Sequence, residues 1–595
     1  MTSSTQNLSI SSLHQAYATG EITPSSLISQ LSKQAKQLTA VWIHLLSEQE
    51  LQPYLVNLKD KSPATHPLFG VPFAIKDNID LVGIPTTAGC VEYTYTPNKS
   101  AFVVTQLINA GAIPLGKTNL DQFATGLVGT RSPFGATPNA FDADYISGGS
   151  SSGSAVATAS GVVSFALGTD TAGSGRVPAC FNNLVGLKPS KGLLSTTGVV
   201  PACRSLDCVS IFALTANDAN LVLQSAAQYD ESDCFARVNS AANMLPVKVK
   251  DNFTFAIPLP EQLQFFGSAT YQSAFTQAVS QLEALGGSKV ILDFSPMLAA
   301  AKLLYEGPWV AERYLATQEI IENNPEAMLD VTRTIISAGN QSNATEAFSA
   351  LYKLQALKIA SDKLVNQVDI LVSPTAGRHY TLAEIVAEPI AYNSNLGYYT
   401  NFMNLLDYAA IAVPTSFSNN KMPFGITLFS QGMTDQKLLT FADKIQQAAQ
   451  LPLGATDWTL PVSTGITKSH SAFVDLVVCG AHLSGMPLNW QLVDRQGILL
   501  ETTDTAAAYK MFAVPGEVER PALIRSPDKG CTFAVEVWRL PIEHFGSFVT
   551  GIAQPLGIGK VELSDGRWLT GFIAESVASL EKNISEFGSW RNYKN

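Results

Sequence analysis

Two segments rich in glycine and serine, separated by an apolar stretch, constrain the fold of this chain more than any other feature. They cover residues 147–154 (SGGSSSGS) and 168–178 (GTDTAGSGRVP), and VATASGVVSFAL lies between them. A stretch of this composition is often a flexible linker. A linker does not carry buried elements, however, and the apolar stretch predicts a helix followed by a buried strand. We therefore expect both segments to be ordered turns on a globular core.

Strands and helices alternate along most of the chain. FTFAIPLP at 253–260 reads as a strand, an amphipathic helix follows at 270–285, and KVILDF reads as the next strand. VDILVSPT at 368–375 and YAAIAVPTSF at 408–417 read as further buried strands. This alternation predicts an α/β fold, with a mixed β-sheet core covered by helices.

The composition of the sequence changes near residue 455. The stretch DWTLPVSTGITKSHS is polar, contains proline and glycine, and is typical of a linker. Short β-rich runs follow it, among them FVDLVVCGAHL and CTFAVEVWRLP. A chain of 595 residues is also too long for one ordinary core. We predict a first domain at 1–455, a linker at 456–470 and a small α+β domain rich in strands at 471–595.

The charge and cysteine content exclude several classes of protein. The net charge is −11, with 38 Lys+Arg against 49 Asp+Glu, whereas a nucleic-acid-binding protein usually presents a basic face. The seven cysteines form no C-x-x-C pair, so neither a zinc site nor a redox motif is indicated. The sequence shows no secretory signal and no apolar run long enough to cross a membrane. We expect a cytoplasmic protein that binds neither nucleic acid nor membrane.

Three segments together indicate nucleophilic chemistry. Lys76 ends the apolar run GVPFAIK, and Ser150 and Ser174 lie in the two Gly/Ser-rich turns. Taken alone, Lys76 is more simply a surface lysine at a strand end, and either turn could be a plain turn or a nest that binds an anion. A serine hydroxyl needs a base before it can attack a carbonyl, and the seven histidines lie outside the three segments. A lysine can be that base if burial lowers its pKa.

These segments, with LVGLKPS after them, resemble the amidase signature family over roughly residues 5–450. The resemblance implies an amidase with a catalytic triad made of a lysine, a serine on a cis peptide bond and a second serine. Position by position, these fall on Lys76, Ser150 and Ser174. Ser150 would relay a proton between the other two side chains, and water would hydrolyse the resulting acyl-enzyme.

The turn around the second serine is expected to stabilise the oxyanion. Ser152 and Ala172 stand where glycine is common in the family, and neither change removes a side chain that the chemistry requires. Small residues let several backbone N–H groups converge on one point, as an oxyanion hole needs. The expected donors are the backbone N–H groups of Thr171, Ala172, Gly173 and Ser174.

A tyrosine and an arginine suggest how an anionic substrate is held. Tyr305 and Arg313 are eight residues apart, which on one helix places them on roughly the same face. Arg313 could bind a carboxylate through two parallel hydrogen bonds. A solvent-exposed arginine beside a packed tyrosine is the simpler local interpretation.

Residues 471–595 resemble the C-terminal domain of the allophanate hydrolase family, through CGAHLSGMPLNWQL, YKMFAVPG, RPALIR and GIGKVELSDGRWLTGFIAE. This resemblance implies hydrolysis of allophanate, a small planar anion, to ammonia and carbon dioxide. It casts Tyr305, Arg313 and Gly126 as substrate ligands. The C-terminal domain is linked in that family to breakdown of the N-carboxycarbamate product, with His482 as the candidate because histidine exchanges protons near neutral pH. His482 could instead be structural, and the domain could serve to form the dimer.

The resemblance implies a homodimer without a metal or an organic cofactor. No Met-Lys-Met biotin-attachment motif occurs, so we expect a separate upstream enzyme to produce allophanate. Two alternatives remain: an amidase of other specificity, such as a glutamine-hydrolysing transamidation subunit, and a non-catalytic scaffold of the same fold. The C-terminal segment argues against the first, and the complete triad argues against the second.

Overall fold

The computed structural model describes residues 6–244, 247, 249, 251–418, 421–463, 465–466 and 473–594. The chain divides into two compact units, one formed by Met1–Asn239 with Pro246–Thr467 and the other by Ser240–Leu245 with Lys468–Asn595. Each unit has its own hydrophobic core.

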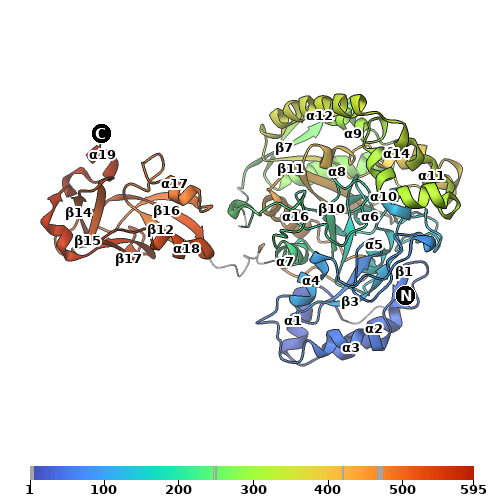
Figure 1. The fold of residues 1–595 in the computed structure, drawn as a ribbon, viewed down its shortest axis with the longest axis horizontal. Helices are drawn as coiled ribbons and strands as arrows, with labels where there is room; N and C mark the ends of the chain where they lie inside the picture. Colours follow the sequence, from blue (N-terminus) through green and yellow to red (C-terminus); the bar gives the residue numbers. More distant parts are fainter. Residues whose placement is uncertain are drawn as a thin grey trace. The chain divides into compact units, whose positions relative to one another are not determined.

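A mixed sheet of eleven strands forms the centre of the first unit (Figure 1). Its strands are β1 (Trp42–Leu45), β2 (Pro72–Lys76), β3 (Ile113–Thr118), β4 (Phe165–Thr169), β5 (Val185–Lys188), β6 (Val209–Ala213), β7 (Phe253–Pro258), β8 (Gly287–Leu292), β9 (Ile370–Pro374), β10 (Tyr408–Phe417) and β11 (Pro423–Gln431). They are ordered β1-β3-β2-β4-β6-β5-β10-β11-β9-β7-β8. The strand β2 is parallel to both β3 and β4, and β7 is parallel to both β8 and β9. The other pairs, which include the long β10–β11 hairpin, are antiparallel.

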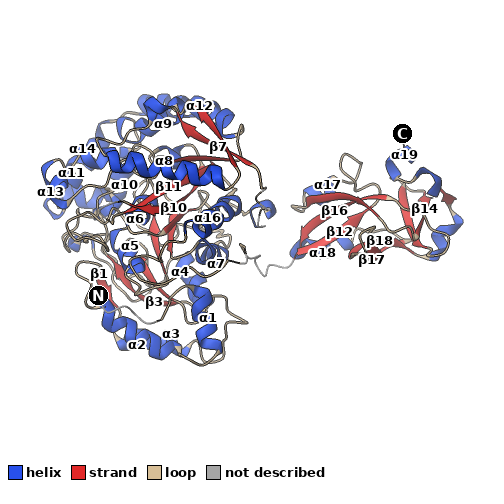
Figure 2. Ribbon diagram, turned by 180° about the vertical axis from the view of Figure 1, so that it is seen from behind, coloured by secondary structure: helices blue, strands red, loops and turns tan. Residues whose placement is uncertain are grey.

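Helices cover both faces and one end of this sheet (Figure 2). The helix α16 packs on β10, and α6 packs on β10 and β11. The helices are α1 (Ile10–Ala18), α2 (Pro24–Ala35), α3 (Glu48–Val56), α4 (Phe102–Asn109), α5 (Ser152–Ala159), α6 (Arg176–Phe181), α7 (Ala216–Ala226), α8 (Ala269–Ala284), α9 (Ser295–Glu306), α10 (Val310–Asn323), α11 (Asp330–Ser337), α12 (Ala344–Val365), α13 (Leu382–Ala387), α14 (Ala391–Leu396), α15 (Phe402–Leu405) and α16 (Asp435–Ala449). Within the described part of the chain, none of the helices combines the length and the apolar character that a membrane crossing requires.

The predicted fold class is confirmed. The strands expected at 253–260, 368–375 and 408–417 correspond to β7, β9 and β10, and the helix expected at 270–285 corresponds to α8. Every residue of β2, β4, β5 and β9 is buried. Helices on both faces of a sheet bury both faces of its central strands, so these strands read as continuous apolar runs rather than as alternating patterns.

The second unit is a small domain rich in strands. A five-stranded sheet is ordered β13-β16-β12-β18-β17, and a three-stranded sheet is ordered β15-β14-β19. Its core includes Leu476, Val537 and the C-terminal Trp590. The elements are β12 (Phe473–Val478), α17 (Trp490–Val493), β13 (Ile498–Asp504), β14 (Tyr509–Val514), β15 (Arg520–Arg525), β16 (Ala534–Pro541), α18 (Ile542–Val549), β17 (Leu556–Glu562), β18 (Trp568–Ala574), β19 (Lys582–Asn583) and α19 (Trp590–Lys594).

The first part of the predicted linker packs on the first unit. Trp458, Leu460 and Ile466 are buried in that unit's core. Within the predicted linker, residues 464 and 467–470 lie outside the described residues.

Candidate active site

The ends of two parallel strands place a lysine beside two hydroxyl groups. The strands β2 and β4 pair in register, so Lys76 and Thr169 lie at neighbouring C-terminal ends. The Lys76 Nζ atom is 2.6 Å from Thr169 Oγ1 and 2.7 Å from Ser150 Oγ. Lys76 and Ser150 are completely buried. The simpler interpretation of Lys76, a surface lysine at a strand end, is therefore wrong.

Ser150 follows a cis peptide bond with Gly149, just before α5 begins. The Ser150 carbonyl accepts a hydrogen bond from the Asp121 N–H at 3.0 Å. A Cβ atom on Gly149 would lie 2.1 Å from Asp121 Oδ2, so only glycine fits at this position. The Asp121 backbone thus binds Ser150, and its carboxylate leaves room only for glycine at position 149.

Burial makes the Lys76 amine a candidate base. It lowers the pKa of the Lys76 ammonium to about 7 from an ordinary 10.5, because a charge is poorly solvated in this interior. The carboxylates of Asp121, Asp207 and Asp170 raise this pKa, and the charge of Arg313, like burial, lowers it. A large fraction of the amine is therefore neutral near pH 7 and can accept a proton.

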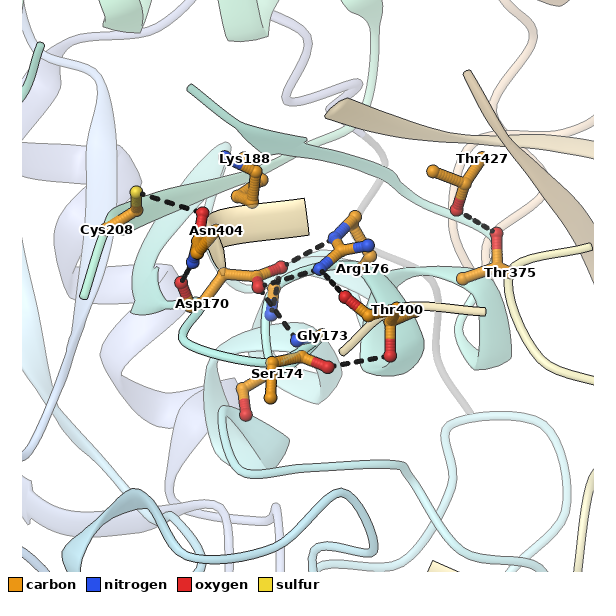
Figure 3. Close-up of polar contacts among 12 residues, drawn as sticks. Asp170, Gly173, Ser174, Arg176, Lys188, Cys208, Thr375, Thr400, Asn404 and Thr427 are labelled. Carbon is orange, nitrogen blue, oxygen red and sulfur yellow. Dashed lines mark hydrogen bonds and ion pairs between the residues drawn. The ribbon is translucent and has the colours of Figure 1, made fainter. Parts of the chain in front are cut away.

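The turn that carries Ser174 is held by a buried ion pair (Figure 3). Asp170 Oδ2 lies 2.9 Å from Arg176 Nε, and Asp170 Oδ1 lies 3.0 Å from the second nitrogen of the guanidinium fork. The same carboxylate accepts the N–H groups of Gly173 at 2.8 Å and Gly175 at 3.2 Å. The Ser174 hydroxyl points away from this pair (Figure 3) and donates to the Gly126 carbonyl at 3.4 Å.

Three of the four expected oxyanion donors are free. Within the described residues, the backbone N–H groups of Thr171, Ala172 and Ser174 have no acceptor. Gly173 departs from the expectation, because its N–H already donates to Asp170. Glycine is needed at position 173 for a steric reason. Its φ is +127°, and a Cβ atom there would lie 2.4 Å from Thr400 Oγ1.

The prediction that one helix carries both Tyr305 and Arg313 is wrong. The helix α9 ends at Glu306 and α10 begins at Val310, because Gly307-Pro308 interrupts the helical backbone. The two side chains nevertheless meet, since the Arg313 guanidinium lies 5.8 Å from the centre of the Tyr305 ring. Arg313 is 2% exposed, so the simpler interpretation of a solvent-exposed arginine is also wrong.

Arg313 reaches the segment that carries Gly126. Its guanidinium donates to Thr125 Oγ1 at 3.0 Å and to the Ala124 carbonyl at 3.4 Å. Gly126 in turn accepts the Ser174 hydroxyl. The predicted nucleophile therefore contacts Gly126, and Arg313 contacts the two residues before Gly126 as well as the Tyr305 ring.

Sequence reasoning missed three polar residues of this site: Thr169, Asp121 and Asp170. Thr169 and Asp170 open the second Gly/Ser-rich segment, so their positions at the end of a buried strand were a usable signal. The sequence carries no such signal for Asp121, because its carboxylate binds the backbone N–H groups of Val128, Gly129 and Arg131. Among the described residues, no group of three His, Cys, Asp or Glu side chains is arranged to hold a metal ion.

His482 lies in the second unit, on a small cavity. Its ring stacks on Phe572 with centroids 5.1 Å apart, and Nε2 is 3.0 Å from Gln491 Oε1. The cavity, of about 20 Å³, is also lined by Cys479 and Arg520. Burial lowers the pKa of His482 and nearby Arg520 lowers it further, so the ring is a neutral imidazole near neutral pH.

Known proteins resemble this chain along its whole length. Urea amidolyase of Saccharomyces cerevisiae is 44% identical over 572 residues, which are 93% of this chain and 31% of that protein. A glutamyl-tRNA(Gln) amidotransferase subunit of Methanosarcina mazei is 31% identical and matches 69% of this chain and 92% of its own length. Allophanate hydrolase of Kluyveromyces lactis superposes with a TM-score of 0.79 at 40% identity and covers 99% of both chains. A serine-to-alanine variant of that hydrolase gives a TM-score of 0.78.

The present chain spans about a third of the length of the urea amidolyases that it matches. The model of the amidase family matches residues 27–439, and the model of the allophanate hydrolase C-terminal domain matches residues 474–595. These two matches cover both compact units. The chain therefore belongs to the amidase family and carries an allophanate hydrolase C-terminal domain.

Proposed function

We propose that this chain hydrolyses allophanate (urea-1-carboxylate) as an amidohydrolase of urea degradation, through a Ser-cisSer-Lys triad. The observation that carries the proposal is the buried Lys76 amine, 2.7 Å from the Ser150 hydroxyl and with a pKa lowered to about 7. A base of this pKa is matched to catalysis near neutral pH. The allophanate hydrolase of Kluyveromyces lactis, similar over 99% of both chains, supports the choice of substrate.

The proposed reaction begins with proton transfer from Ser174. Ser150 passes that proton to the neutral Lys76 amine while Ser174 Oγ attacks the terminal amide carbon of allophanate. The free N–H groups of Thr171, Ala172 and Ser174 lie on the turn where they would stabilise the oxyanion, and one such donor typically contributes about 3–4 kcal/mol. The carbon–nitrogen bond then breaks, the proton returns to the departing ammonia, and water hydrolyses the acyl-enzyme to release N-carboxycarbamate.

Arg313 is the proposed partner of the substrate carboxylate. A buried guanidinium presents a planar fork that matches a carboxylate, and Arg313 is 2% exposed. Tyr305, which remains 39% exposed, would close the pocket over the bound anion. Gly126 would line the wall, since its carbonyl already lies against Ser174.

Ammonia release across a panel of amides tests this function. Purified protein should release ammonia from allophanate far faster than from glutamine or asparagine, and Ser174→Ala should release none from any of them. Preference for glutamine would favour the amidotransferase-like alternative, which the similarity to the glutamyl-tRNA(Gln) amidotransferase of Methanosarcina mazei keeps open. Absence of turnover, together with no labelling of Ser174 by a fluorophosphonate probe, would favour a non-catalytic scaffold.

For the second unit we propose that His482 assists breakdown of N-carboxycarbamate. A neutral imidazole lies beside the cation of Arg520 on one cavity, so a proton acceptor and a positive charge that would attract a carboxylate are close together. His482→Ala should leave the first ammonia release unchanged and let N-carboxycarbamate accumulate, which ¹³C NMR with labelled allophanate would detect. His544→Ala, on α18 of the same unit, is the matched control. Normal breakdown in His482→Ala would leave a structural role for this histidine.

We also propose a homodimer that uses α12. This helix exposes Phe348, Leu351, Tyr352 and Ile359, whose spacing places them on one face, to between 49% and 72%. A large contiguous apolar face on a surface helix often marks an interface. The double variant with Phe348→Asp and Tyr352→Asp should run as a monomer in light scattering, with Leu580→Asp in the second unit as the control. The cytoplasmic location and a separate enzyme that supplies allophanate stay predictions from the sequence.

A further inference from the structure

Two buried guanidinium groups hold the same residue beside the proposed nucleophile. Arg131 donates to the Thr125 carbonyl at 3.0 Å and to the Pro389 carbonyl at 2.6 Å. Arg313 donates to the Thr125 side chain at 3.0 Å. Arg131 is 4% exposed and Arg313 is 2% exposed. Thr125 is thus fixed through its backbone by one cation and through its hydroxyl by the other.

Neither guanidinium forms an ion pair, but the two differ: negative groups around Arg313, Asp207 and Glu312 among them, raise its pKa in spite of burial, whereas burial prevails at Arg131 and lowers its pKa. No carboxylate of a described residue pairs with the guanidinium of Arg131 or Arg313. Buried Arg176 and Lys117 of the same unit differ, since Asp170 lies 2.9 Å from the former and Asp77 lies 2.8 Å from the latter. An unpaired buried charge is costly unless an anion accompanies it.

Asp121 is the carboxylate nearest in sequence to Arg131, but it binds the backbone. It accepts the N–H groups of Val128, Gly129 and Arg131 and forms no ion pair with the guanidinium of Arg131, although its charge raises the pKa of that group. The Arg131 Nε–H is buried and has no hydrogen-bond acceptor among the described residues. Burial also lowers the pKa of Arg131, the direction expected for a cation whose charge is incompletely balanced.

The position of Arg131 links it to the reacting groups. A Cβ atom on Gly126 would lie 3.2 Å from Arg131 Cδ, so the arginine stem packs directly behind Gly126. The Gly126 carbonyl accepts the Ser174 hydroxyl. The charges of Tyr305 and Arg313 both affect the pKa of Arg131, so these side chains lie near one another.

We propose that Arg131 is a positioning residue that selects for anionic amides. It fixes the Thr125–Gly126 wall of the pocket and, together with Arg313, creates a positive potential that a carboxylate on the substrate neutralises. The proposal rests on the proposed function and names the substrate class of the same site: a small amide that carries a carboxylate next to the scissile group. A neutral amide of the same shape leaves the guanidinium of Arg131 uncompensated and binds less well.

Allophanate and biuret test this selection, because biuret replaces the carboxylate of allophanate with a neutral amide. We expect Arg131→Gln to lower kcat/KM for allophanate by at least about tenfold, mainly through KM, since a hydrogen-bonded charge typically has an effect of this size. Turnover of biuret should change much less, so the ratio of the two kcat/KM values should fall. Arg131→Lys, which keeps the charge, should retain more of that ratio than Arg131→Gln.

Two further variants keep the experiment decisive. Arg131→Met preserves the stem behind Gly126 and replaces Arg131→Gln if the latter fails to fold. Arg333→Gln, on α11 and paired with Glu326, is the matched control and should leave the ratio unchanged. Equal losses for allophanate and biuret in the neutral variants would overturn the proposal and leave Arg131 a structural brace.

Failure of the proposed function gives a different result. If the wild-type protein hydrolyses neither compound, allophanate is not the substrate. The comparison is then repeated with malonamate and malonamide, which differ in the same way. A preference for the anionic member that Arg131→Gln removes supports the selection, whereas a preference unaffected by Arg131→Gln contradicts it.

Discussion

The pH dependence of turnover depends on the neutral amine of Lys76. Burial lowers its pKa to about 7 from 10.5. At pH 7 about half of the amine is then neutral, against roughly one part in 3000 for an ordinary lysine. A general base acts only when it is deprotonated, so kcat/KM should rise with pH, reach half of its maximum near pH 7 and level off about one pH unit higher.

Removing a neighbouring carboxylate should shift this profile in a defined direction. Among the charged groups around Lys76, Asp121 raises its pKa most, followed by Asp207 and Asp170. Asp121→Asn removes one negative charge that stabilises the ammonium, so the midpoint of the profile should move to lower pH. Asp443→Asn is the matched control, because Asp443 is also buried in this unit but binds Ser463 and does not act on Lys76.

Initial rates of ammonia release at low substrate concentration, from about pH 5.5 to about pH 9, measure kcat/KM for the free enzyme. Thermal unfolding of each variant shows whether it is folded under the same conditions. A folded Asp121→Asn protein with an unchanged midpoint would refute the electrostatic argument. A wild-type rate that falls as the pH rises through 7 would refute Lys76 as the base.

Three other variants test the turn around the nucleophile. Ser174→Ala should abolish turnover yet change the free energy of unfolding by less than about 1 kcal/mol, because only a 3.4 Å bond to a carbonyl is lost; a large drop in thermal stability would contradict this. Gly173→Ala should destabilise the protein by about 1–3 kcal/mol and reduce kcat, since its Cβ would lie 2.4 Å from Thr400 Oγ1; a variant with full activity and stability would show that the turn adapts. Asp170→Asn should lower the free energy of unfolding in denaturant titrations by about 3–5 kcal/mol, because Arg176 stays buried without its partner; a loss below about 1 kcal/mol would mean that the pair contributes little.

The sequence predicts the class of fold well, because strands such as β9 and β10 are mainly apolar and are buried over almost their whole length. The order of the strands is a different matter. Most neighbours in the sheet are distant in sequence, for example β5 and β10, and no local pattern specifies their pairing.

The candidate site, like the fold, can be predicted from the sequence only in part. Lys76 and Ser150 belong to recognisable segments, but Asp121 acts through backbone N–H groups that no side-chain pattern reveals. Gly307-Pro308 indicates the break between α9 and α10, and this local signal outweighs the eight-residue spacing of Tyr305 and Arg313.

The strand β2, the segment between β3 and α5 and the turn after β4 supply the lysine and both serines. Tyr305 and Arg313 come instead from α9 and α10, which lie between β8 and β9. The nucleophile and its base are therefore encoded apart from the tyrosine and the arginine proposed to contact the substrate carboxylate. Replacing α9 and α10 would change which amide is accepted and leave unchanged the lysine and the two serines that break the bond. Mutations that alter preference should accordingly cluster between residues 295 and 337 and in the Thr125–Arg131 segment, rather than at the lysine and the two serines.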